Sequence, residues 1–190
     1  MVNETFNILR LLIEHQEEKF SIRKISKRRK VNYKSAYNAV MKLQNEGVVD
    51  LEKIGNTINC RFNKKFNPLV FSVEDERRKE LLKNKNIKII YSRLNELGFS
   101  FVVLIFGSIV KSTFNKYSDI DLLIISEKQK EIESVLSLIP LKIHPTFITN
   151  KEFISMAKTR EFSVVSEAIK KNIILIGIED YYRLLEKVIL

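Results

Sequence analysis

Two aspartates, Asp119 and Asp121, stand at the start of DIDLLIIS, an apolar run that otherwise has the pattern of a buried strand. Residues i and i+2 of a strand point to the same side, so both carboxylates project together while Ile120 points into a core. Adjacent carboxylates repel each other unless a cation lies between them, and hard oxygen ligands select Mg²⁺ or Mn²⁺. The pattern predicts a divalent-metal site. The alternative is a polar loop-to-strand junction in which Asp119 caps a turn.

An earlier apolar run, FSFVVLIFGS, ends in Gly107 and Ser108. A glycine lets a phosphate approach the backbone closely, and a serine can cap the following helical turn while it bonds a phosphate oxygen. A helix N-terminus with a metal nearby suits a nucleoside triphosphate. The two motifs together predict a nucleotide site between two strands.

The order of these motifs resembles the nucleotidyltransferase superfamily of the DNA polymerase β type, and in particular its small prokaryotic members, the minimal nucleotidyltransferases. The shared pattern is an apolar strand, Gly-Ser, a spacer of ten residues here, and Asp-apolar-Asp opening a second strand. The tail EAIKKNIILIGIEDYYRLLEKVIL is similar to the family's closing helix, short strand and final helix. The resemblance spans residues 88–190 and implies a small α/β domain with a mixed sheet.

The resemblance also implies an activity, the transfer of a nucleoside monophosphate from ATP or another triphosphate to a hydroxyl. Gly107 and Ser108 would hold the β- and γ-phosphates, and Asp119 and Asp121 would hold Mg²⁺ or Mn²⁺ and serve in catalysis. Lys111 lies where small members often carry an arginine, so it is either a phosphate contact or a plain surface lysine. Some small members are antitoxins that modify a partner toxin, so a protein hydroxyl is a credible acceptor.

One departure from the family concerns the third carboxylate, which active members generally carry on a later strand. The corresponding strand, LKIHPTFIT, has no acidic residue. His144 is its one side chain expected to act as a base near neutral pH, and its role is either in catalysis, in packing or at the domain surface. Glu131 and Glu133 are expected on a solvated helix, and Glu152 near a helix N-terminus. The alternative function is therefore a transcriptional regulator whose degenerate transferase domain binds a nucleotide or a partner without turnover.

The N-terminal third has helical periodicity in TFNILRLLIEHQEEK, after Ser21, and again from Asn32 to Gly47, followed by a hairpin signal at Gly55-Asn56. The inner face of the third helix is expected to consist of Tyr33, Ala36, Tyr37, Val40 and Leu43. Three short helices and a hairpin resemble a winged helix-turn-helix domain.

That resemblance implies double-stranded DNA as a partner, with a protein-docking or dimerisation role as the alternative. Residues 1–66 carry 14 Lys/Arg against 7 Asp/Glu, as expected of a segment that meets a polyanion. The basic and polar side chains expected at DNA are Lys24, Lys27, Arg28, Arg29, Lys30, Lys34, Ser35, Asn38, Lys42, Lys53 and Arg61.

The fold class expected for the whole chain is α+β. It comprises a winged helix domain at 1–66, a helical connector at 67–97 and a nucleotidyltransferase-like domain at 98–190. Within the connector, EDERRKELLKNK is interpreted as a solvated helix face. The single cysteine, the absence of a long apolar run and an N-terminus unlike a secretory signal favour a cytoplasmic protein with no membrane partner. Because winged regulators are commonly dimers, a homodimer is expected.

Overall fold

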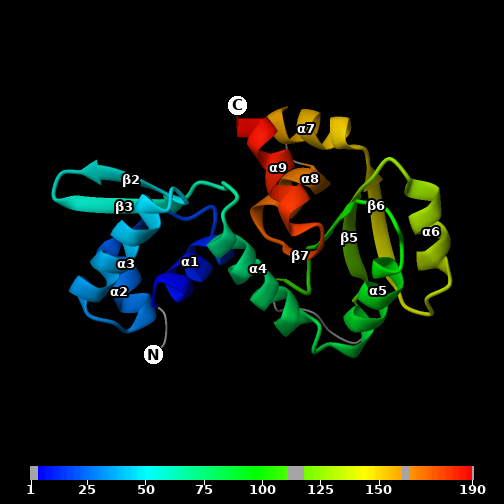
Figure 1. The fold of residues 1–190 in the computed structure, drawn as a ribbon, viewed down its shortest axis with the longest axis horizontal. Helices are drawn as coiled ribbons and strands as arrows, with labels where there is room; N and C mark the ends of the chain where they lie inside the picture. The colour runs from blue at the N-terminus through cyan, green and yellow to red at the C-terminus, as the bar shows by residue number, and fades with distance from the viewer. Residues whose placement is uncertain (1–3, 111–117, 160–162, 190) are drawn as a thin grey trace. The chain divides into compact units, whose positions relative to one another are not determined.

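The computed structural model describes residues 4–110, 118–159 and 163–189 (Figure 1). Contacts between Cα atoms divide the chain into two compact units, Met1–Val73 (unit 1) and Glu74–Leu190 (unit 2). Among the described residues, no helix combines the length and the apolar character needed to cross a membrane.

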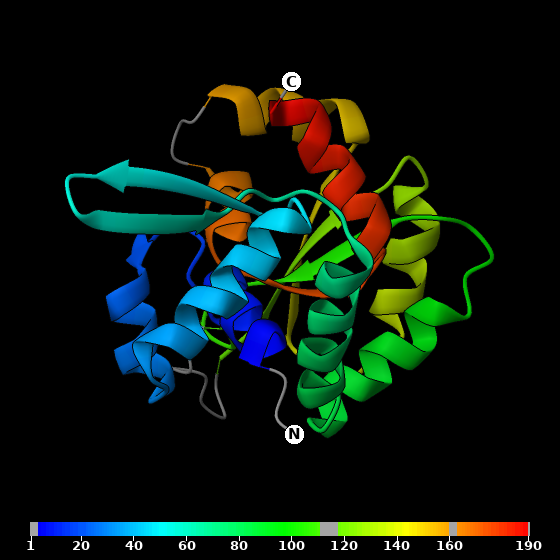
Figure 2. The same ribbon diagram turned by 60° about the vertical axis from the view of Figure 1, so that its left-hand side comes forward.

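Unit 1 has helices and strands in the order α-β-α-α-β-β, and the next helix begins at its end. Its elements are α1 (Glu4–Glu14), β1 (Phe20–Ser21), α2 (Ile22–Arg29), α3 (Tyr33–Asn45), β2 (Val49–Ile54) and β3 (Thr57–Phe62). The strands form an antiparallel sheet in the order β1-β3-β2. Helices and a hairpin therefore form where the periodicity predicts them, and β1 is a short additional strand. In Figures 1 and 2 the β2–β3 hairpin extends beyond the three helices.

Local signals in the sequence set the helix boundaries of unit 1. The Ser21 hydroxyl accepts a hydrogen bond from the Lys24 backbone at 3.1 Å, and the Asn32 side chain accepts one from the Ser35 backbone at 2.8 Å. Each bond satisfies a backbone N–H that the first helical turn leaves unpaired. The start of α3 is thereby fixed at Tyr33, which determines the face that each later side chain of this helix occupies.

The inner face of α3 differs from the expectation at its two tyrosines. The buried residues are Ala36, Ala39, Val40 and Leu43, whereas the side chains of Tyr33 and Tyr37 are 52% and 37% exposed. Small alanines at the contact let the neighbouring helices approach closely, so the larger rings lie beside the packed face rather than in it. The prediction that both tyrosines belong to the core is wrong.

Cys60 is a structural residue of this unit. Its side chain is 1% exposed, and its S–H donates a hydrogen bond to the Phe20 carbonyl at 3.2 Å. Burial raises the pKa of the Cys60 thiol to about 12, so the thiol stays protonated and unreactive at neutral pH.

Unit 2 is built on a four-stranded mixed sheet in the order β6-β5-β4-β7. The strands β4 (Val102–Ile105) and β5 (Ile120–Ile125) are antiparallel, as are β4 and β7 (Ile173–Ile176), whereas β5 and β6 (Ile143–Ile148) are parallel. The helix α6 (Gln129–Ser137) connects the two parallel strands. The mixed sheet expected from the sequence is confirmed.

Helices cover both faces of this sheet, as Figure 1 shows. Side chains of α6 and of α5 (Lys85–Asn95) pack on one face in a core that includes Ile120, Leu122 and Ile124. On the other face α8 (Val164–Lys170) contacts β5 and α9 (Ile178–Ile189) contacts β4. The helix α7 (Asn150–Thr159) follows β6 in the chain. Because side chains alternate along β5, Asp121 belongs to the same face as Leu123 and Ile125.

The helix α4 (Pro68–Leu81) contains a buried ion pair. Glu74 is fully buried and Arg77 is 5% exposed, and the two side chains form a hydrogen bond of 2.5 Å. The expectation that EDERRKELLKNK forms a solvated face is therefore wrong for these two residues. Their partners, Tyr182 and Asn172, are supplied by distant segments of the chain.

Candidate functional site

The Gly-Ser turn and the Asp-Ile-Asp strand meet at one end of the sheet. Since β4 and β5 are antiparallel with Ile105 opposite Leu122, the residues after β4 lie beside the residues that open β5. The Phe106 N–H donates to the Asp121 carbonyl at 3.3 Å, and Gly107 follows directly. The Gly-Ser and Asp-Ile-Asp motifs, which are ten residues apart in the sequence, are therefore in direct contact in the fold.

Gly107 has the backbone conformation and the close approach that only glycine tolerates. Its φ is +70°, and a Cβ built there would overlap Oδ2 of Asp121 and lie 3.1 Å from the Asp121 Cγ. Any side chain at this position would therefore displace the carboxylate. Ser108 follows in the same turn, half-buried, while Lys111 lies outside the described residues.

The two carboxylates differ in their surroundings. Asp119 is exposed immediately before β5, whereas the Asp121 side chain, inside the strand, is 27% exposed. Ile120 between them is 3% exposed, and its N–H donates to the Lys142 carbonyl of the neighbouring chain segment at 2.9 Å. The strand geometry thus directs the two acidic side chains away from the core that Ile120 enters.

His144 is brought to this end of the sheet by the pairing of parallel strands. In the register of β5 with β6 it lies opposite Asp121, and its Nδ1 is 3.4 Å from Oδ1 of that carboxylate. The His144 side chain is 71% exposed, so it does not pack in the core. In the sequence, the signal for this residue was that LKIHPTFIT contains a histidine and no acidic residue. Only the register of the two strands shows that this histidine is next to Asp121.

The other acidic residues considered from the sequence lie elsewhere. Glu131 and Glu133 are exposed on α6. Glu152 accepts hydrogen bonds from the Thr149 N–H at 2.7 Å and the Thr149 hydroxyl at 2.9 Å. These bonds lower the pKa of Glu152, which therefore stabilises the start of α7 as a carboxylate.

The donor set at this end of the sheet fits a magnesium ion that is shared with a substrate. Within residues 4–110, 118–159 and 163–189, no group of three or more His, Cys, Asp or Glu could enclose a metal. Magnesium is commonly held by one or two carboxylates with phosphate oxygens and water completing its octahedron. Asp119 and Asp121 provide such carboxylates, and Gly107 lies directly against the second of them.

Gly107→Ala is expected to weaken magnesium-dependent ATP binding about tenfold, because the new methyl group moves the Asp121 carboxylate. The positive φ adds a cost of about 1 kcal/mol to the stability of unit 2. Gly98→Ala is the matched control, since no atom lies within 4 Å of the position that its methyl group would take and its φ is not in the strained range. Calorimetric titration with ATP and Mg²⁺ measures the affinity of both variants. Unchanged binding by Gly107→Ala would show that this glycine is not part of the nucleotide site.

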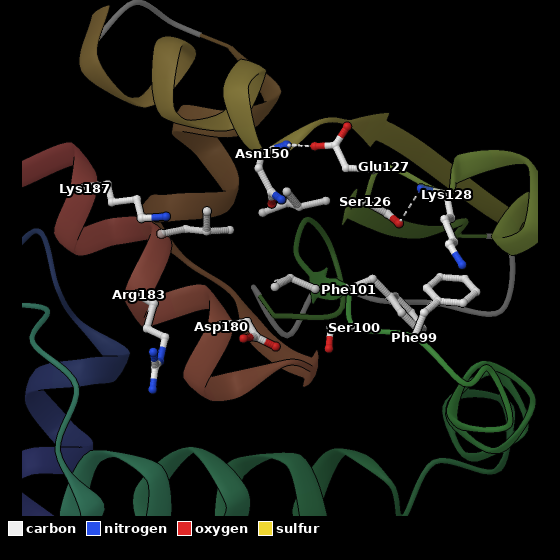
Figure 3. Close-up of a pocket in the computed structure, with 13 residues that line it drawn as sticks. Phe99, Ser100, Phe101, Ser126, Glu127, Lys128, Asn150, Asp180, Arg183 and Lys187 are labelled. Atoms are coloured by element: carbon white, nitrogen blue, oxygen red, sulfur yellow. Dashed lines mark hydrogen bonds between the residues drawn. The ribbon is translucent and has the colours of Figure 1, made fainter.

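A separate cavity of about 340 Å³ lies at the opposite end of the same strands (Figure 3). It is bordered by Ile125 and Ser126, at the end of β5, and by Val102, which begins β4. Charged side chains at its rim come from α9 and from the segment after β5, and Lys128 lies over the Phe99 ring with 4.7 Å between Nζ and the ring centroid. Asp121 stands near the other end of β5, so this cavity is not part of the candidate nucleotide site.

The cations considered for DNA contact fall into two groups in unit 1. Lys24 bonds Glu18 at 2.7 Å, Arg29 approaches Glu4 at 3.5 Å, and Arg61 lies 3.9 Å from Asp50. Within the part of the chain that the structure describes, no ion pair involves the exposed side chains of Lys27, Arg28, Lys30, Lys34, Lys42 and Lys53. Asn38 is exposed on α3, and Ser35 is half-buried beside the Asn32 cap.

Comparison with known families agrees with the arrangement in unit 2. Residues 85–176, from the start of α5 to the end of β7, match the family model described as a nucleotidyltransferase domain. The match supports the nucleotidyltransferase superfamily, and with it nucleotidyl transfer in general, for this part of the chain. Proteins of this superfamily generally use a nucleoside triphosphate and a divalent metal. Searches of curated proteins and of solved structures found no match.

Proposed function

We propose that unit 2 is a magnesium-dependent nucleotidyltransferase that moves a nucleoside monophosphate from ATP or another triphosphate to a hydroxyl. The observation that carries this proposal is the close contact of Gly107 with the Asp121 carboxylate, which brings the Gly-Ser turn against the Asp-Ile-Asp strand. The nucleotidyltransferase family match across the same sheet supports it independently.

The residues of this site have separate roles in the proposed reaction. Asp119 and Asp121 hold Mg²⁺ or Mn²⁺, which when bound neutralises charge that develops on the phosphates. Gly107 leaves the backbone accessible to the β- and γ-phosphates, and Ser108 and Lys111 contact them. His144, exposed beside Asp121, is the residue we propose to orient the acceptor hydroxyl.

The lack of an acidic residue on β6 is compatible with turnover. Phosphoryl transfer depends mainly on the positioning of the reacting groups and on charge stabilisation, which the carboxylate pair and the backbone at Gly107 provide. A protein hydroxyl, such as that of a partner toxin, is the acceptor we propose first. The test incubates the full chain with α-labelled ATP, Mg²⁺ and host extract, and label on a macromolecule is the expected result.

A second candidate is a nucleotide-binding transcriptional regulator in the cytoplasm, favoured by the acid-free strand that carries His144. The labelling experiment distinguishes the two functions if nucleotide binding is measured alongside it. Metal-dependent ATP binding without label transfer supports the regulator. Absence of both binding and transfer contradicts each proposal for this site.

For unit 1 we propose a winged helix domain that binds double-stranded DNA as a homodimer. The order α1-β1-α2-α3-β2-β3, the sheet order β1-β3-β2 and the projecting hairpin support this assignment. The exposed cations of α2 and α3, which lack ion pairs among the described residues, provide the contacts to phosphates. A protein-docking role is the alternative.

Binding to duplex DNA is expected to weaken steeply with salt. With four or five of these cations at phosphates, a plot of log K against log salt concentration should have a slope of about −4. Fluorescence anisotropy of a labelled duplex measures this slope. Lys24→Ala, which removes a cation already bonded to Glu18, is expected to change it less than Lys34→Ala does. Failure to bind at low salt contradicts the DNA proposal.

A further inference from the structure

Two exposed tyrosines form an aromatic surface at the start of α3. Tyr33 and Tyr37 are one helical turn apart, and their rings stack with 6.4 Å between centroids and 25° between planes. Each keeps a large part of its surface in water, 52% for Tyr33 and 37% for Tyr37. The core of unit 1 does not use these rings, so their packing leaves them available to a ligand.

The surroundings of this tyrosine pair are strongly cationic. Residues 20–45, which include all of α2 and α3, contain eight Lys/Arg and no Asp or Glu. Lys24 and Arg29 are compensated by acids outside that segment. For Lys30 and Lys34, which flank Tyr33 in the sequence, the described residues show no ion pair, and both side chains are exposed. An apolar surface bordered by such charge is complementary to a polyanion that also offers apolar groups.

Duplex DNA offers that combination in its major groove. Contacts from lysine and arginine to phosphates position a protein but do not read the sequence. The thymine C5-methyl group is the apolar feature of the base-pair edges there, and an α-helix fits the groove.

We propose that Tyr33 and Tyr37 are the base-reading surface of unit 1 and that their rings pack against thymine methyl groups in the major groove. This inference rests on the proposed DNA binding and assigns its chemistry: cations on α2 and α3 contact phosphates, and the tyrosine pair selects thymine-containing duplex. The other ligands considered for this surface are single-stranded DNA and an acidic protein, and the test below distinguishes both from duplex DNA.

The experiment compares two pools of random-sequence duplex DNA, one made with thymine and one with uracil, which differ by one methyl group at each thymine position. Uracil pairs as thymine does but lacks the C5-methyl group. The wild-type full chain is expected to bind the thymine pool about fourfold more tightly for each methyl group that a ring covers. Tyr33→Ala/Tyr37→Ala is expected to bind both pools equally, more weakly than wild type, and with an unchanged salt slope.

Two further variants separate the ring from the hydroxyl and from charge. Tyr33→Phe/Tyr37→Phe keeps both rings and is expected to keep the preference for thymine. Lys34→Ala is expected to weaken binding to both pools alike and to reduce the salt slope by about one. Because both tyrosines are exposed, circular dichroism should show the same fold for all variants.

The outcomes distinguish this inference from the proposed DNA binding. Equal wild-type binding to the two pools, or a thymine preference that survives in Tyr33→Ala/Tyr37→Ala, overturns the role of the rings and leaves DNA binding in place. Tighter binding to single strands than to duplex overturns the major-groove placement. Absence of any DNA binding by the wild type, with or without capture of an acidic protein, overturns both proposals.

Discussion

Asp121→Asn is expected to lower the rate of nucleotidyl transfer by roughly a hundredfold or more, because the loss of the proposed metal ligand would remove several kcal/mol of charge stabilisation. The amide has nearly the shape of the carboxylate but lacks its charge. Label transfer from α-labelled ATP measures the rate, and calorimetry measures magnesium-dependent binding of ATP.

Asp180→Asn is the matched control for this substitution. Asp180 is exposed on α9 at the separate cavity, at the opposite end of the sheet from Asp121. The same chemical change there is expected to leave transfer at the wild-type rate. Equal rates for Asp121→Asn and the wild type would show that the transferred label does not come from this site. Loss of transfer in both variants would point to a general defect rather than to a lost metal ligand.

Arg77→Met is expected to destabilise unit 2 by about 3–5 kcal/mol, because it leaves the buried Glu74 carboxylate without its cation. Arg77 donates to Glu74 Oε2 at 2.5 Å and to the Asn172 carbonyl at 2.6 Å. The Tyr182 hydroxyl donates to the other oxygen of Glu74 at 2.6 Å. Burial, followed by the charge of Glu74, raises the pKa of Tyr182 well above its ordinary value, so this hydroxyl remains a donor.

Urea denaturation measures the change in the free energy of unfolding. Hydrogen exchange then assigns this change to unit 2 if the amides of β4 and β5 lose protection. Arg183→Met is the control, since Arg183 pairs with Glu179 at the exposed surface of α9 and is expected to leave stability almost unchanged. The double variant Glu74→Gln/Arg77→Met should lose less stability than Arg77→Met alone, because it leaves no buried charge without a partner. A small effect of Arg77→Met would mean that water reaches Glu74 when the arginine is removed.

Local patterns were sufficient to predict the candidate nucleotide site and most of the elements around it. Apolar runs of strand length predict β4, β5 and β6, and the motif spacing places Gly107 and Asp121 at the ends of two such strands. These properties depend on residues that are close in the sequence, where backbone preference and side-chain periodicity act directly. The roles of these residues in transfer remain predictions.

Contacts between distant segments decided the features that local patterns misjudged. The charged run in α4 looks solvated, but Glu74 and Arg77 are buried because α9 supplies Tyr182 and the segment before β7 supplies Asn172. The helical period of α3 predicts that Tyr33 lies on its apolar face. In the structure the small residues Ala36 and Ala39 occupy the buried face, and the Tyr33 ring is exposed to water.

The sequence by itself predicted which residues would hold a metal and a triphosphate, because that prediction depends on residue type and spacing. Only the tertiary structure decided that His144 lies beside Asp121, because the register of two parallel strands is set by packing across the whole sheet. Likewise, only the fold shows which basic side chains of unit 1 already have acidic partners and which remain exposed for a polyanion.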